Sequence, residues 1–229
     1  MTSFRIPALD QSAPADRPGA PAAAPGPLEP EPFGRLRWFT RWVPSVLAIL
    51  LIVAPGVAAD NSNEAWAALV KGGHVALVRH GNAPPGYGGD PPGMKIEDCK
   101  TQRNLDDTGR EQARAVGEAF RKRGVQVDRI LSSPMCRCLD TARLMAVGSV
   151  ETSWALLPDR DRNAPVRLSE LKEIVSAWRG PGTLVLVTHG FTVQNLIGII
   201  PGQAETVVLE PAPGSGRGGD LVGRIAAPQ

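Results

Sequence analysis

The chain has 229 residues, enough for one domain with additional segments. Its formal net charge of +2 is too small to suggest nucleic-acid binding. Its five Trp, one Tyr and five Phe are not interleaved with basic residues in the manner that lets rings stack on bases. No nucleic acid is therefore expected among its partners.

The N-terminal part of the chain predicts a leader and an export signal. Residues 1–34 are rich in Pro, Ala and Gly without apolar periodicity, which predicts disorder. In residues 35–59, arginines precede an apolar stretch that ends in small residues, which is typical of a secretory signal. The apolar stretch, residues 43–59, is shorter than the roughly 20 residues of a spanning helix. We expect a periplasmic or secreted domain over residues 60–229, with a membrane tether through residues 43–59 as the alternative.

The three cysteines all lie in the predicted mature domain, at Cys99, Cys136 and Cys138. An oxidising compartment permits a disulfide. Cys136 and Cys138 are separated by one residue, which strains a bridge between them. Cys99 is therefore expected to pair with either of the other two. This spacing also differs from the Cys-x2-Cys pattern of zinc sites, so no metal is expected.

Apolar periodicity and turn residues predict alternating strands and helices after residue 60. In chain order we expect a helix over 64–71, a strand over 75–79, a helix to 123, a strand over 127–131, a helix opened by Pro134, a strand over 150–156, a helix over 168–178, a strand over 184–188, a helix over 192–200 and a hairpin of 206–210 with 221–225. Asp107 or Thr108 is expected to cap the second helix, in a capping box with Glu111. The alternation predicts an α/β three-layer sandwich with a mostly parallel central sheet flanked by helices.

Two of the chain's three histidines follow apolar strands and precede a glycine. The first strand ends in Arg79-His80-Gly81, and a later strand ends in Thr188-His189-Gly190. Ligands of open α/β sheets bind outside the carboxyl ends of the strands. We therefore predict one site built from both ends, covered by the Pro- and Gly-rich loop 81–100. His74 lies at the start of a strand and is expected to be structural.

The residues at these strand ends suit phosphoryl chemistry. Arg79 and Arg137 can each bind phosphoryl oxygens with two parallel hydrogen bonds. A neutral His80 can attack phosphorus and form a covalent phosphohistidine. His189 can donate a hydrogen bond to the developing charge, and Asn82 is a further candidate donor. The arginines supply the charge that a metal would otherwise supply, so no metal or cofactor is expected.

Three motifs in this order resemble the histidine phosphatase superfamily, which also includes the cofactor-dependent phosphoglycerate mutases. They are Arg79-His80-Gly81, then Ser132-Ser133-Pro134 with Arg137 and Thr141-Ala142, and then Thr188-His189-Gly190. The resemblance implies a phosphoglycerate mutase-like fold and a small periplasmic phosphatase. It also implies an acidic proton donor after the third strand. Asp159 fits the Leu-Pro-acid pattern best, with Asp161 and Glu151 as competitors.

The sequence leaves three functions open. The leading hypothesis is an exported phosphomonoesterase that acts on a phosphorylated small molecule or envelope component. A mutase-type phosphotransferase is a second hypothesis, disfavoured because an exported protein does not meet glycolytic intermediates. The third is a phosphate- or phosphosugar-binding protein without turnover. Such a protein would bind phosphate tightly and hydrolyse nothing.

Overall fold

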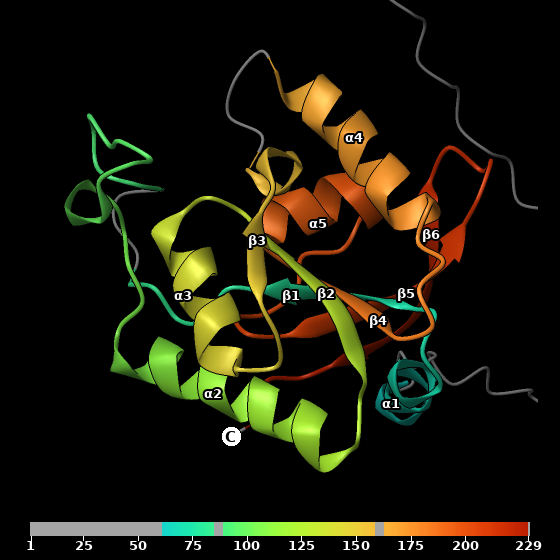
Figure 1. Cartoon of the computed structure of the whole chain (residues 1–229). Coiled ribbons are helices and arrows are strands. Elements are labelled where there is room, and N and C mark those ends of the chain that lie inside the picture. Colours follow the sequence, from blue (N-terminus) through green and yellow to red (C-terminus); the bar gives the residue numbers. More distant parts are fainter. Residues whose placement is uncertain (1–60, 85–88, 159–162, 229) are drawn as a thin grey trace, which may run out of the picture. The chain divides into compact units, whose positions relative to one another are not determined.

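The computed structural model describes residues 61–84, 89–158 and 163–228. They form a six-stranded sheet with helices on both faces, shown in Figure 1. Within these ranges no helix combines the length and the apolar character needed to cross a membrane. The predicted leader and the predicted signal or anchor lie outside the described residues.

Helices and strands alternate along most of the domain, as the sequence predicts. The elements are α1 (Ser62–Lys71), β1 (Val75–Arg79), the 3-10 helix η1 (Cys99–Thr101), α2 (Asp107–Lys122), β2 (Val127–Ser132), α3 (Cys136–Met145), β3 (Val150–Thr152), the 3-10 helix η2 (Trp154–Leu156), α4 (Ala164–Ser176), β4 (Thr183–Thr188), α5 (Gly190–Ile197), β5 (Thr206–Ala212) and β6 (Gly218–Ile225).

The strand order is β3-β2-β4-β1-β5-β6. The first four strands of this order run parallel, and β5 and β6 extend the sheet as an antiparallel pair. The two strands that carry the predicted histidines, β1 and β4, are therefore hydrogen-bonded neighbours in the centre of the sheet. The predicted α/β sandwich with a mostly parallel sheet and the predicted terminal hairpin are both confirmed.

The path of the chain explains which helices cover which face. From β1 the chain moves outward to β2 and then to β3, and from β3 it returns to β4. Parallel crossovers are almost always right-handed, so a reversal of direction moves the connecting helix to the opposite face. Accordingly α2 and α3 pack with α1 on one face, and α4 and α5 pack on the other, as Figure 1 shows.

Alternation along the central strands fills both cores. In β1, Ala76 and Val78 pack in the cluster with α1, α2 and α3, whereas Val75 and Leu77 pack in the cluster with α4 and α5. A strand buried on both faces has no polar side, which explains the unbroken apolar run before Arg79.

The predicted cap of α2 is wrong. Asp106, not Asp107 or Thr108, is the N-cap, and its carboxylate accepts from the Gly109 amide at 2.8 Å. Thr108 therefore lies inside the first turn and makes no capping box with Glu111. A tertiary contact also favours Asp106 as the N-cap, because its second carboxylate oxygen accepts a hydrogen bond from the Asn82 side chain.

Other element boundaries also differ from the prediction: α4 spans Ala164–Ser176 rather than residues 168–178, and α5 spans Gly190–Ile197 rather than residues 192–200. Pro134 does not open α3, which begins at Cys136, because the Ser133 amide still bonds to the carbonyl of Val187 at 2.9 Å and keeps the backbone extended. The strand predicted over residues 150–156 ends at Thr152 and is followed by η2. The amide of Ser153 bonds to the Ser132 carbonyl at 2.8 Å, at the end of the pairing with β2.

Candidate active site

The carboxyl ends of β1, β2 and β4 converge on one side of the sheet. Arg79 pairs with Thr188 in the β1–β4 register, and the His80 amide then bonds to the Thr188 carbonyl at 3.0 Å. The residues that directly follow these paired strand ends are His80 and His189, so the two histidines lie side by side. The rings of His80 and His189 lie with centroids 5.4 Å apart, edge to face at 67°.

His80 is buried, and its geometry defines its tautomer. Its Nδ1 lies 2.8 Å from the Gly81 carbonyl oxygen. A carbonyl oxygen can only accept, so Nδ1 carries the proton and the Nε2 lone pair is available. Burial, followed by the positive charge of Arg137, lowers the pKa of His80 to about 3. His80 is therefore uncharged at neutral pH.

Gly81 lets the chain cross close over α2. A Cβ atom on Gly81 would lie 2.4 Å from the carbonyl oxygen of Gly109, and one on Gly109 would lie 2.0 Å from that of Asn82. The Gly81 amide donates to the Thr141 hydroxyl at 3.1 Å, and this hydroxyl donates to the Arg137 carbonyl at 2.7 Å. These contacts connect the backbone directly after His80 to α3.

His189 is buried at the N-cap position of α5. Its Nδ1 lies 3.4 Å from Nη2 of Arg137, and its Nε2 lies 2.9 Å from the Ser133 hydroxyl. A guanidinium can only donate, so Nδ1 accepts and the ring proton is on Nε2, towards Ser133. The sequence motif with two serines thus supplies a partner that holds the second histidine in position.

Arg137 is among the largest fully buried side chains, with 1% relative exposure. It lies in the first turn of α3, next to both histidines. A buried guanidinium needs anionic or carbonyl partners to offset the lost hydration. Here those partners include Asp90, as described below.

Arg79 lies at the edge of the site and is half-buried. Its Nη1 donates to the Pro201 carbonyl at 2.7 Å. A Cβ atom on Gly190 would lie 3.4 Å from the guanidinium carbon of Arg79. Because glycine has no side chain, the Arg79 guanidinium has room beside the start of α5. Burial lowers the pKa of Arg79, and the charge of Glu205 opposes this shift.

Asn82 has a structural partner in this arrangement. Its side-chain amide donates to Asp106 at 2.6 Å, and its backbone amide donates to the Gln112 side chain at 2.8 Å. Asn82 thus fixes the segment after His80 onto α2. Its predicted role as a phosphate donor stays a prediction.

Two of the three candidate acids, Asp159 and Asp161, lie outside the described residues. The third, Glu151, lies on β3 in an exposed ion pair with Arg129 at 2.7 Å. The hydrogen bond from Arg129 lowers the pKa of Glu151, which makes it a poor proton donor at neutral pH. The chain before Asp159 is anchored close to His189, because Thr188 and Thr192 donate to the carbonyls of Leu156 and Leu157.

Three residues of the loop before α2 join the site although the sequence did not single them out as site residues. Asp90 forms an ion pair with Arg137 at 2.7 Å, and Arg103 contributes positive charge near His80. Gln102 accepts from the Cys136 amide at 2.9 Å, at the start of α3. Gln102 and Arg103 therefore lie at the site.

A disulfide ties this loop to α3. Cys99 and Cys136 are bonded, 37 residues apart in sequence, which selects one of the two predicted pairings. Cys138 is the free cysteine, buried with its sulfur 3.5 Å from Nε2 of His189. Burial raises the pKa of the Cys138 thiol to about 12, so this thiol stays protonated.

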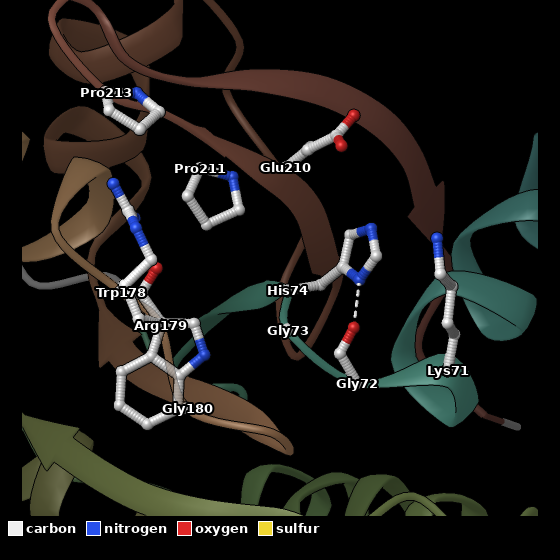
Figure 2. Close-up of a pocket in the computed structure, with 10 residues that line it drawn as sticks. All are labelled: Lys71, Gly72, Gly73, His74, Trp178, Arg179, Gly180, Glu210, Pro211 and Pro213. Carbon is white, nitrogen blue, oxygen red and sulfur yellow. Dashed lines mark hydrogen bonds between the residues drawn. The ribbon is translucent and has the colours of Figure 1, made fainter.

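The third histidine lies at the opposite end of β1. His74 precedes the strand, and its Nδ1 lies 2.7 Å from the Gly72 carbonyl oxygen. It lines a cavity of about 420 Å³. Figure 2 shows His74 in this cavity together with Trp178 and Glu210. Its backbone contact fits the structural role that the sequence predicts.

Comparisons with known proteins agree with the motifs. Residues 75–158 match the family model of the histidine phosphatase superfamily (branch 1). No curated protein matches the chain.

Several solved structures are similar to this chain. The protein histidine phosphatase SixA complexed with tungstate is 18% identical with a TM-score of 0.48, covering 67% of this chain and 97% of its own. A phosphoserine phosphatase from Entamoeba histolytica is 16% identical with a TM-score of 0.48, covering 67% and 96%. A mycobacterial glucosyl-3-phosphoglycerate phosphatase is 20% identical with a TM-score of 0.48, covering 67% and 99%.

The matched segment contains both the Arg79-His80-Gly81 motif and Arg137, and His189 joins them in space from β4. The part of the chain from residue 75 to residue 158 belongs to the histidine phosphatase superfamily (branch 1).

Proposed function

We propose that this domain hydrolyses phosphate monoesters through a covalent phosphohistidine on His80. One observation carries the proposal: a buried, uncharged His80 has its Nδ1 satisfied by Gly81 and lies beside Arg137 and His189. Its Nε2 is the atom that can attack phosphorus. The surrounding cations favour the anionic phosphoryl group and disfavour protonation of the ring.

In the first step, Nε2 of His80 forms a bond to phosphorus while the bond from phosphorus to the ester oxygen breaks. The departing oxygen takes a proton, for which we propose Asp159 as the donor. The proposal is supported by the anchoring of Leu156 and Leu157, which lie three and two residues before Asp159, to Thr188 and Thr192 on either side of His189. Arg137 stabilises the charge on the phosphoryl oxygens, and His189 adds to this when a phosphoryl oxygen replaces the Ser133 hydroxyl as the acceptor of its Nε2 proton.

In the second step, water attacks the phosphohistidine and the nitrogen–phosphorus bond breaks. The proton of the water passes to the Asp159 carboxylate, which restores the acid, and inorganic phosphate leaves. His80 returns to its neutral form with Nδ1 still bonded to Gly81. The charge in this mechanism comes from arginines, so the proposal includes no metal ion.

We further propose that the protein acts outside the cytoplasm on a phosphorylated small molecule or envelope component. The predicted signal in residues 35–59 motivates this location. The Cys99–Cys136 disulfide supports it, because such bonds persist mainly in oxidising compartments. Phosphate binding without hydrolysis would instead favour the binding-protein hypothesis.

The test is release of phosphate from p-nitrophenyl phosphate by the full chain in excess chelator. His80→Gln removes the nucleophile, and His74→Gln is the matched control at the opposite end of β1. We expect activity in the wild type and in His74→Gln, and a loss of at least about a thousandfold in His80→Gln. Retained activity in His80→Gln would exclude the mechanism.

A further inference from the structure

The carboxylate of Asp90 is bound to the guanidinium of Arg137. Its Oδ1 accepts from Nη1 at 2.7 Å, and its Oδ2 accepts from Nη2 at 3.2 Å. The Oδ1 atom also accepts from the backbone amide of Arg103 at 3.1 Å. The Asp90 side chain is only 5% exposed, so this ion pair is shielded from water.

These contacts use most of the donors of Arg137. A guanidinium has five N–H groups, two on each Nη and one on Nε. Apart from Asp90, Nη1 donates to the Arg103 carbonyl at 3.4 Å, and Nη2 lies 3.4 Å from Nδ1 of His189. The remaining donor, Nε, is buried without a partner among the described residues. The edge formed by both Nη atoms is therefore occupied by a carboxylate.

A phosphoryl group would need the same edge. Carboxylate and phosphate both bind arginine through two parallel N–H···O bonds, so they compete for one planar arrangement of donors. Two anions cannot share it without strong repulsion in a site this buried. Burial tends to raise the pKa of Asp90, but the charge of Arg137 and the Arg103 amide outweigh it and bring the pKa below its usual value. Asp90 therefore carries its negative charge at neutral pH.

We propose that Asp90 is a displaceable occupant of the phosphate subsite on Arg137 and thereby sets the affinity of the site for phosphoryl groups. This inference rests on the proposed function, because it takes Arg137 to be a phosphate ligand. A phosphoryl group of higher charge exchanges with the carboxylate, and Asp90 returns after the product leaves. The apparent affinity for phosphate is the intrinsic affinity multiplied by the fraction of molecules in which Arg137 is accessible. If one molecule in ten is accessible, the apparent affinity is about tenfold lower.

The second effect of Asp90 is to neutralise Arg137 between turnovers. A buried guanidinium without an anion is costly, so the carboxylate stabilises the unliganded protein. Removal of the Asp90 charge should thus lower the stability of the unliganded protein and strengthen phosphate binding at the same time. If Asp90 only positioned Arg137, its substitution would lower both the stability of the protein and the affinity for phosphate.

The experiment is calorimetric titration of the full chain with inorganic phosphate, comparing the wild type with Asp90→Asn. Asp140→Asn is the matched control, because it makes the same chemical change at a partly exposed position on the helix that carries Arg137. We expect Asp90→Asn to bind phosphate on the order of tenfold more tightly, with KM lowered in parallel. We expect Asp140→Asn to match the wild type.

Phosphate-dependent thermal stability provides a second measurement if Asp90→Asn is destabilised. Phosphate should raise its Tm more than that of the wild type, because the ligand replaces the missing anion. Unchanged or weaker phosphate binding, together with an equal or smaller shift in Tm, would overturn the proposal. The binding measurement needs no turnover, so it separates failure of this inference from failure of the proposed hydrolysis.

Discussion

The rings of His80 and His189 lie 5.4 Å apart because each is the first residue after one of two adjacent parallel strands. The amide of His80 bonds to the carbonyl of Thr188, so the backbone itself fixes the spacing. In this arrangement the Nε2 lone pair of His80 is available, and His189 is held between Ser133 and Arg137. Rigid strands thus fix the two histidines relative to each other, as the proposed catalysis requires.

Gly109→Ala should destabilise the protein and lower activity together. Its Cβ would lie 2.0 Å from the carbonyl oxygen of Asn82, which belongs to the segment directly after the nucleophile. Backbone atoms on both sides cannot move independently, so we expect a loss of about 1–3 kcal/mol in the free energy of unfolding. Gly148→Ala is the control, since its Cβ would meet only the end of the Ile130 side chain. Denaturant unfolding and kcat/KM measure both effects, and an unchanged Gly109→Ala would contradict the close contact.

Reduction of the Cys99–Cys136 disulfide should lower both stability and activity. The bond closes a loop of 37 residues and holds the segment of Asp90 and Arg103 against α3. We expect a loss of about 2–4 kcal/mol in the free energy of unfolding and a lowered kcat, because the start of α3, which carries Arg137, loses its covalent anchor. A Cys99→Ser/Cys136→Ser variant should resemble the reduced wild type and show no further response to reductant. Equal kinetics of the oxidised and reduced wild type would show that the bond does not support the site.

The stability of the protein should fall with acidification because of His80. Its pKa is about 3 in the folded protein, below the ordinary value of 6.5. Below about pH 6.5 the unfolded chain therefore binds a proton that the folded state does not. This favours unfolding by about 1.4 kcal/mol per pH unit until the folded pKa is reached.

Denaturant unfolding of the wild type and His80→Gln from about pH 7 to about pH 4 measures this contribution. The variant should show a shallower loss of stability, because glutamine does not titrate. All other ionisable groups are the same in both proteins, so the difference in slope isolates His80. Parallel curves would mean that the folded state does not depress the pKa of His80.

The sequence predicted the features that depend on local patterns. Apolar runs ending at Arg79 and Thr188 defined the two central strands, and the following histidines had to meet once these strands were parallel neighbours. The buried Arg137 was predicted from its motif and from the chemistry of phosphate binding. These residues define the centre of the site.

The sequence could not predict what depends on contacts distant along the chain. Asp90 meets Arg137 across 47 residues, through a Pro- and Gly-rich loop whose path is fixed by the disulfide and by Gln102. The cap of α2 was wrong for a related reason. Asp106 and Thr108 are both good capping residues, and the contact with Asn82 decides between them.

The most direct test of the central claim is capture of the phosphoenzyme. The full chain is mixed with a radiolabelled phosphate monoester and stopped in alkaline detergent, where a phosphohistidine survives. We expect acid-labile label on His80 in the wild type and in His74→Gln, and none in His80→Gln. Hydrolysis of the ester by a wild type that carries no label, or label retained in His80→Gln, would contradict covalent catalysis by His80.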